Sequence, residues 1–342
     1  MITKNKILTI FFTCTAGLTL LATPLLASEN TEQGWLELLK NNEAEAIRLF
    51  TMAIEEDAED GRAYLGLSYA HDLLLDDSSS WAAFRKALEV LPNPYPYIYA
   101  AQFTRRFSSN LYKSSSGAER VMRHVLDEPD TLGILKAMAY EVLGNIEERG
   151  GRVNDAKKLY SNLGAIAKWK LIGPFHNISG SGHDKTFPPR NEDRPDAVYK
   201  GSDGRDVWWF APPNTRIDGW QDFARHFPSV YGVFFAQTYV HSPTTQRVQL
   251  RLGTSGAYRL FVNNQLASET INEHNNDVDT YITEVTLHEG WNRILVKCDN
   301  SKLDRCNFLL RLTDANGNPF EGLETSLDAK PFSNESVAGN RK

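Results

Sequence analysis

The chain has 342 residues, of which 41% are hydrophobic and 23% are charged, and its formal net charge is −6 at pH 7. This length suits two domains of ordinary size, and the composition excludes a disordered chain and a polytopic membrane protein. The negative charge, with no block of basic residues after the first few positions, argues against a nucleic-acid-binding protein.

The amino-terminal segment has the layout of a secretory signal peptide. Lys4 and Lys6 precede an uncharged, mostly apolar run over 7–26, and Ala27 is followed by polar residues. We expect cleavage after Ala27, which predicts a secreted or periplasmic protein of the bacterial cell envelope. The alternative is an uncleaved anchor, because the run is just long enough to span a bilayer.

The segment over 28–165 has the rhythm of amphipathic helices and contains a repeat. Four stretches share one spacing, in which a small residue is followed four positions later by a large one and three positions later by a small or medium apolar one. The stretches are Ala46-x3-Phe50-x2-Ala53, Ser80-x3-Phe84-x2-Ala87, Ala118-x3-Met122-x2-Val125 and Ala156-x3-Tyr160-x2-Leu163. Such a face lets a helix nest closely against its partner, so the sequence predicts helical hairpins.

Further residues give these hairpins a family likeness. Leu65-Gly66 is followed by Tyr69, and Pro92 follows the second stretch. The region resembles tetratricopeptide repeats (TPR), in which stacked helix pairs form a groove for peptides or partner domains. The resemblance implies a solenoid and a protein partner. It carries over no particular ligand, because Trp35 and Trp81 lie away from the usual tryptophan position and Ser80 replaces an alanine.

From residue 168 the pattern changes to short alternating runs broken by Gly, Pro, Asn and Asp, which predicts an antiparallel β-sandwich. The expected strands are Trp169–Pro174, Val207–Ala211, Val233–Val240, Val248–Leu252, Tyr258–Val262, Gln265–Ser268, Thr280–Thr286, Arg293–Lys297 and Asn307–Leu312. Asn263-Asn264 predicts a two-residue hairpin turn, because Asn tolerates positive φ.

Two stretches of this half resemble galactose-binding-like jelly-roll domains. They are Tyr258–Leu266, with its Asn turn, and Leu287–Lys297, with a Gly-Trp-Asn turn before an Ile-Leu-Val-Lys strand. The joining stretch Ile172–Pro189 is similar to the segment that links TPR arrays to jelly rolls in large secreted bacterial proteins with a transglutaminase-like domain. We expect no counterpart of that catalytic activity here. Its mechanism needs an activated cysteine, and the two cysteines of the mature chain are assigned below to a disulfide.

The expected organisation is therefore an α+β multidomain protein. It comprises a signal peptide over 1–27, a TPR-like helical solenoid over 28–165, a Gly/Pro-rich joining segment over 166–190, an antiparallel β-sandwich of jelly-roll type over 191–328 and a flexible tail over 329–342.

The mature chain keeps two cysteines, Cys298 and Cys306. The flanking runs read as the two strands of a hairpin, and a hairpin would bring the sulfurs together. In an oxidising compartment this predicts a structural disulfide. The alternative, a catalytic or metal-binding thiol pair, lacks both the C-x-x-C spacing and a neighbouring His.

The candidate binding residues are aromatic: Trp208, Trp209, Trp220 and Tyr231. Sugar rings stack on such side chains, but packing in a core is the commoner use, and adjacent Trp208 and Trp209 must point to opposite faces of a strand. His176, His183 and Asp184 offer a mixed, scattered ligand set, which is read as turn and hydrogen-bonding residues rather than a metal site.

The sequence thus predicts a non-enzymatic binding or assembly module, with no catalytic residue, metal or cofactor. Protein partners would dock on the helical repeats, with no nucleic acid bound and no stable membrane insertion after signal cleavage. The alternative is a carbohydrate-binding protein whose jelly roll recognises a polysaccharide. A hydrolase, or an accessory subunit of one, is a third class, because the separation of a carboxylate pair is set in three dimensions.

Overall fold

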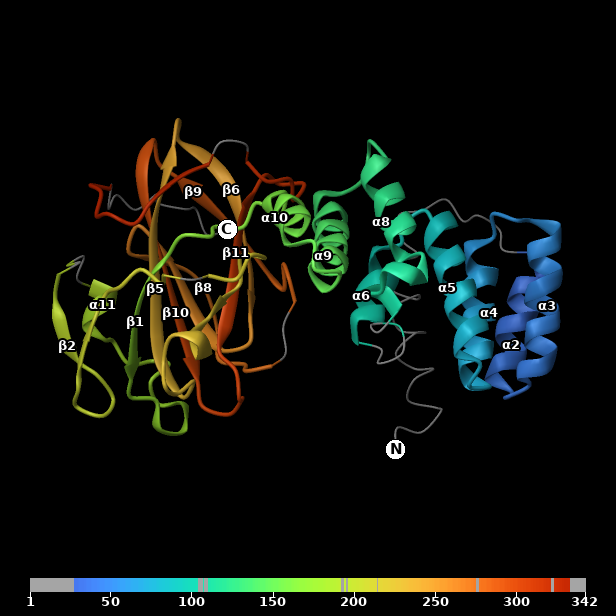
Figure 1. The fold of residues 1–342 in the computed structure, drawn as a ribbon, viewed down its shortest axis with the longest axis horizontal. Coiled ribbons are helices and arrows are strands. Elements are labelled where there is room, and N and C mark those ends of the chain that lie inside the picture. Colours follow the sequence, from blue (N-terminus) through green and yellow to red (C-terminus); the bar gives the residue numbers. More distant parts are fainter. Residues whose placement is uncertain are drawn as a thin grey trace, which may run out of the picture. The chain divides into compact units, whose positions relative to one another are not determined.

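The computed structural model describes residues 28–332 except 104–106, 108, 109, 192, 193, 195, 214, 275, 276, 321 and 322. The predicted signal peptide and the tail from residue 333 lie outside the described residues. The described part confirms a mixed α+β protein in which helices precede antiparallel sheets (Figure 1). Among these residues, no helix is long and apolar enough to cross a membrane.

The chain forms two compact units, which divide between Pro129 and Asp130. The first unit is helical, and its α-helices are α2 (Glu29–Leu39), α3 (Glu43–Glu56), α4 (Gly61–Leu73), α5 (Asp77–Val90), α6 (Tyr95–Phe103) and α8 (Ala118–Asp127). Short polar side chains begin three of them, because Ser28, Asp60 and Asp76 accept backbone N–H groups of α2, α4 and α5.

Phe50 of α3 holds the first three helices together. Its ring is fully buried between Gly34 of α2 and Gly66 of α4, and Trp35 meets it edge to face with ring centroids 5.6 Å apart. A Cβ atom on Gly66 would lie only 2.2 Å from the Phe50 ring. The close approach of α3 and α4 therefore requires glycine at this position.

All four repeated stretches from the sequence are buried. The small, large and small-to-medium members of each, from Ala46, Phe50 and Ala53 to Ala156, Tyr160 and Leu163, are each at most 4% exposed. The fourth stretch lies on α10 (Val153–Ser161), where Tyr160 packs against Gly144 of α9 (Gly133–Arg149) as Phe50 packs against Gly66. The repeat therefore marks a recurring packing mode between neighbouring helices.

The second unit contains α9, α10 and two larger antiparallel sheets. This unit begins earlier in the chain than the domain boundary predicted at residue 165. The reason is that the α9–α10 hairpin and the segment that follows it pack on the strands. Gly133 N donates to the oxygen of Asn316, and Arg311 Nε donates to the oxygen of Leu163. Figure 1 shows α10 beside β6 and β11.

The larger sheet has the order β1-β5-β10-β7-β8, with β12 also paired to β5, and the smaller sheet has the order β4-β11-β6-β9. A separate hairpin joins β2 and β3. The bounds are β1 (Lys170–Phe175), β2 (Val198–Lys200), β3 (Asp206–Trp208), β4 (Gln221–Asp222), β5 (Gly232–Ser242), β6 (Gln246–Thr254), β7 (Ala257–Val262), β8 (Gln265–Thr270), β9 (Tyr281–Leu287), β10 (Gly290–Asn300), β11 (Asn307–Thr313) and β12 (Glu324–Ser326).

The two sheets share one apolar core, to which the longer strands contribute alternate residues. Val248, Leu250 and Leu252 of β6 enter it together with Ile294 and Val296 of β10. The predicted turn is confirmed: Asn263 and Asn264 have φ values of 46° and 64°, and Val262 pairs with Gln265 across it.

The sequence prediction that the strands of Cys298 and Cys306 form a hairpin, which motivated the predicted disulfide, is wrong. β10 pairs with β5 and β7, whereas β11 pairs with β4 and β6, so the two strands belong to different sheets. Cys298 and Cys306 are free thiols buried in the common core, and burial raises the pKa of both well above the ordinary thiol value. The sequence does not show that the chain passes from one sheet to the other between β10 and β11, because two consecutive strands have the same residue pattern whether or not they pair with each other.

A buried polar cluster lies on the outer face of the smaller sheet. Asp279 Oδ2 pairs with Nη1 of both Arg251, at 3.1 Å, and Arg311. Arg311 also donates to the oxygens of Leu163 and Gly317, which links the sheet to the end of the helical hairpin. On α9, burial raises the pKa of Glu141 to about 8, and the carboxylates of Asp277, Asp218 and Asp279 add to this effect.

We predict that Gly66→Ala destabilises the first unit by about 1–3 kcal/mol, because the clash with Phe50 outweighs the gain of about 1 kcal/mol in helix propensity. Urea unfolding measures the change. In a Phe50→Leu background the same substitution should cost less, since the clashing ring is gone. Equal costs in both backgrounds would show that the predicted contact is absent.

We predict that, as pH rises from 5 to 8, the free energy of unfolding of the second unit falls in the wild type relative to the Glu141→Gln variant. In this range the unfolded chain releases the Glu141 proton before the folded chain does, since the folded pKa is the higher one. The difference should grow by at most about 1.4 kcal/mol per pH unit. Denaturant unfolding at pH 5, 6.5 and 8 tests this, and a constant difference would contradict it.

Candidate functional site

The outer face of the larger sheet carries charged residues at its centre. On β10, Ile294, Val296 and Cys298 enter the common core, so Arg293 and Lys297 point to the opposite side. The segment that follows β1, including α11 (Pro188–Asn191), covers this face. Phe187 of the segment packs there with Phe175, Phe235 and Phe261 in a second apolar cluster, which also includes Trp209 and Leu295.

Lys297 anchors the covering segment. Its side chain is buried, with the residue only 2% exposed, and Nζ donates to the oxygens of Gly182, His183 and Lys185 at 2.7, 2.5 and 3.0 Å. Burial lowers the pKa of this ammonium to about 8. Lys297 thus fixes the backbone of the covering segment to the centre of the sheet.

Arg293 performs the same role four residues earlier on the same face of β10. Its guanidinium donates to Gln237 Oε1, to Asn264 Oδ1 at 2.7 Å and to the oxygen of Pro189 at 3.0 Å. The backbone of Arg293 also exchanges hydrogen bonds with Asn263. The β7–β8 turn, the sheet and α11 are therefore held in one arrangement.

A buried histidine–carboxylate pair completes this layer. His183 Nδ1 lies 2.9 Å from Asp299 Oδ2, and His183 Nε2 lies 3.9 Å from Glu269 Oε2. Burial raises the pKa of Asp299, while His183 and Lys297 act in the opposite direction. The pair ties the start of the covering segment to the end of β10.

A pocket of about 240 Å³ lies between the covering segment and the sheet. We call it the sheet pocket. Its lining residues are Lys185, Thr186, Arg190, Asn191, Phe235, Arg259, Phe261, Leu266 and Lys297. Four of these nine side chains are cationic and none is a carboxylate, so the pocket is suited to an anion.

The four cations differ in how they are neutralised. Arg259 forms ion pairs of 2.6 Å with both Asp184 and Glu269, and Lys297 is saturated by three carbonyl groups. Within the described residues, neither Lys185 nor Arg190 forms an ion pair with a carboxylate. These two side chains leave uncompensated positive charge at the pocket.

Arg190 is held in a fixed orientation. Its guanidinium carbon lies 4.0 Å from the centroid of the Phe261 ring, and Nη2 donates to the oxygen of Asn264 at 2.8 Å. Burial lowers the pKa of Arg190, and the neighbouring Arg293 and Arg259 lower it further. An anionic ligand would relieve this repulsion.

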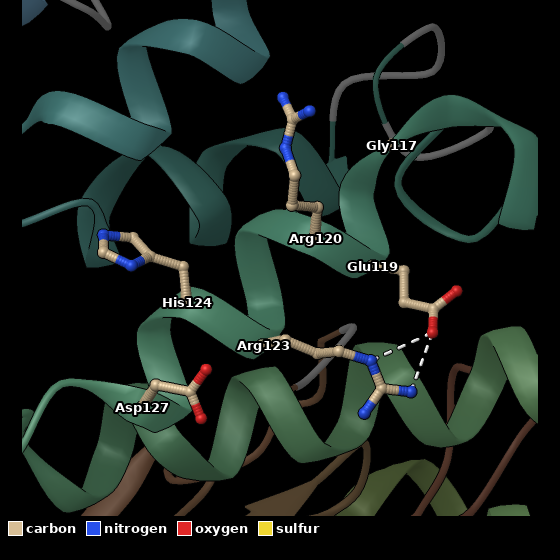
Figure 2. Close-up of a pocket in the computed structure, with 6 residues that line it drawn as sticks. All are labelled: Gly117, Glu119, Arg120, Arg123, His124 and Asp127. Carbon is tan, nitrogen blue, oxygen red and sulfur yellow. Dashed lines mark hydrogen bonds and ion pairs between the residues drawn. The ribbon is translucent and has the colours of Figure 1, made fainter.

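The first unit has a larger hollow of about 490 Å³ along α8, lined by Gly117, Glu119, Arg120, Arg123, His124 and Asp127. Figure 2 shows Arg123 hydrogen-bonded to Glu119 within it. Arg120 pairs with Glu89, and His124 Nδ1 lies 3.7 Å from Glu128. The cations here are compensated by carboxylates, so the sheet pocket is the stronger candidate site.

The four predicted aromatic residues differ in exposure. Trp208 is 57% exposed and Trp209 is 7% exposed, so they do lie on opposite faces of the chain. Tyr231 is 55% exposed just before β5, and Trp220 is half-buried near Gly253. Among the described residues, no ring contact joins any two of the four.

His183 and Asp184 are hydrogen-bonding residues of the covering segment, with Asp299 and Arg259 as their partners, whereas His176 is exposed. No group of three His, Cys, Asp or Glu side chains within the described ranges is arranged to hold a metal ion. Sequence reasoning missed Arg190 and Lys297. The available signal was that Arg293 and Lys297 share one face of a strand whose other face is apolar.

Comparisons with known proteins identify no family. No family model matches the chain, and no curated protein matches it. Among solved structures, a β-glucosidase from Kluyveromyces marxianus aligns with 25% of this chain and 11% of its own at 17% identity and a TM-score of 0.20.

Two further alignments are equally limited. The PA14 domain of the antifreeze protein MpAFP aligns with 30% of this chain and 55% of its own, at 14% identity and a TM-score of 0.22. An anti-sigma factor domain-containing protein from Clostridium clariflavum aligns over 50% of each chain, at 16% identity and a TM-score of 0.27. With TM-scores this low, the alignments support neither a shared fold nor a shared activity.

We predict that Trp209→Ala destabilises the second unit by about 3–5 kcal/mol, because it empties a place in the second apolar cluster. Trp208→Ala, at the neighbouring but exposed position, should cost about 1 kcal/mol or less. Denaturant unfolding of both variants gives the comparison. Similar costs would mean that the two side chains are not placed as described.

Proposed function

We propose that this protein is a non-enzymatic binding protein of the bacterial cell envelope. The observation that carries the proposal is the sheet pocket, in which Lys185 and Arg190 face a ligand-sized space without carboxylate partners. The lining consists of cationic, apolar and neutral polar side chains, which hold a ligand by charge and contact. The pocket would be the recognition element of the second unit.

The architecture of the second unit supports this role. We propose that its sheets form a galactose-binding-like jelly roll. The support comes from the two antiparallel sheets around a common core and from the Asn263-Asn264 turn between β7 and β8. On this scaffold the covering segment and the β7–β8 hairpin, rather than the exposed tryptophan, would supply the ligand contacts.

The helical unit would dock a protein partner. We propose that it is TPR-like, and the support is the buried small–large–small repeat and the packing of Phe50 between two glycines. The protein would thereby hold a small ligand with one unit and a protein with the other. The predicted signal peptide and envelope location are part of the proposal.

Glycan binding on an aromatic surface is the second candidate function. One observation favours it: Trp208 and its cross-strand partner Val198 are both largely exposed on the β2–β3 hairpin. Loss of ligand binding in folded Trp208→Ala protein, with binding retained in Arg190→Ala, would favour this candidate over the sheet pocket.

We predict that ligands of the sheet pocket raise the melting temperature of the protein without being consumed. The probes are a panel of neutral sugars, sugar acids, sugar phosphates and aromatic carboxylates, followed by thermal unfolding. A ligand at 100 times its Kd should stabilise the folded protein by about 2.7 kcal/mol. Mass spectrometry after prolonged incubation checks that the ligand is unchanged.

Arg190→Ala should abolish the shift, whereas Arg123→Ala, in the hollow along α8, should retain it. A shift that survives in Arg190→Ala would remove the sheet pocket as the binding site. Conversion of a panel member into product by the wild-type protein but not by Arg190→Ala would replace the binding proposal by an enzymatic one.

A further inference from the structure

We propose that the sheet pocket binds the carboxylate of an acidic sugar, a uronic acid residue, with Arg190 and Lys185 as the groups that distinguish it from a neutral sugar. This inference rests on the proposed function, because it names the ligand class of the same pocket.

The geometry of the Arg190 hydrogen-bond donors favours a carboxylate ligand. A guanidinium has five N–H donors in a planar fork, and within the described residues Arg190 uses one hydrogen bond, to Asn264. Stacking on Phe261 fixes the plane of the fork, so the remaining donors can bind both oxygens of a carboxylate side by side. The arginine is thus oriented before the ligand arrives.

The amount of charge favours a single negative charge. Arg259 and Lys297 are already satisfied, which leaves the two cations Lys185 and Arg190. Asp184 and Glu269, which pair with Arg259 beside the pocket, add negative potential that opposes a dianion. A monoanionic carboxylate therefore fits better than a phosphate monoester.

The uncharged lining favours a sugar ring. Leu266, 48% exposed, offers an apolar surface for the C–H face of a ring, and Phe261 lies beneath the Arg190 guanidinium. Thr186 and Asn191 are exposed polar side chains that can hydrogen-bond hydroxyl groups. At about 240 Å³ the pocket is smaller than the roughly 300–1,000 Å³ of sites for drug-sized ligands, which favours a ligand of the size of one sugar ring over a long amphiphile.

Isothermal titration of the full mature chain tests the inference with matched pairs of probes. D-galacturonate is compared with D-galactose and D-glucuronate with D-glucose, while polygalacturonate and its methyl ester separate a polymeric from a free source. At least one acid should bind tenfold or more tightly than its neutral partner, and its affinity should fall as salt rises. Inorganic phosphate and acetate are the ion controls.

Variants assign the discrimination to its residues. Arg190→Gln should remove the preference for the sugar acid over the neutral sugar, and Arg190→Lys should restore part of it. Lys185→Ala should lower the affinity for the sugar acid severalfold. Arg123→Ala should bind like the wild type. Circular dichroism and melting temperature establish that each variant is folded.

Three results would overturn the inference. They are equal affinity for acid and neutral sugar, acetate or phosphate binding as tightly as the uronate, and a preference that survives in Arg190→Gln. If the pocket instead binds a different class of panel ligand through Arg190, the inference fails while the proposed binding function stands. If no panel ligand depends on Arg190, both fail.

Discussion

The second unit depends on β10 being buried on both faces. Ile294, Val296 and Cys298 fill the core between the sheets, while Arg293 and Lys297 lie under the covering segment. A buried ammonium or guanidinium is costly unless hydrogen bonds satisfy it. Carbonyl groups of the covering segment do so for Lys297, and Gln237, Asn264 and Pro189 do so for Arg293. The two cations therefore specify where the segment lies, and its position creates the sheet pocket.

The cations of the sheet pocket fall into two groups: some bind groups of the protein itself, and others keep their charge for a ligand. Lys297 and Arg259 line the pocket, but their donors are directed at carbonyl groups and carboxylates of the protein. Lys185 and Arg190 are on the segment that those contacts hold in place. A binding site can then combine a rigid base with two cations whose charge remains for a ligand, which is the preorganisation that lowers the cost of binding.

The helical hairpins are built on a different constraint, the close approach of two helices at glycine. Phe50 against Gly34 and Gly66, and Tyr160 against Gly144, show the same fit in the two units. The ring fills the space that a side chain at the glycine would occupy. The spacing of small and large residues along the chain was sufficient to find these helices, because the packing follows the helical period.

The sequence by itself determined that a helical half precedes a strand-rich half, and it also determined the buried repeat and the Asn263-Asn264 turn, because each follows from local periodicity or local backbone preference. It missed the short strands β2, β4 and β12, which carry too few residues for a period to be recognised. Only the tertiary structure decided which strands pair, and so placed Cys298 and Cys306 in strands of different sheets. It also decided that Trp209 is core and that Arg190 meets Phe261, residues 71 positions apart. Strand partners and pocket walls are contacts between distant segments, and a pattern of neighbouring residues does not encode which distant segment lies opposite.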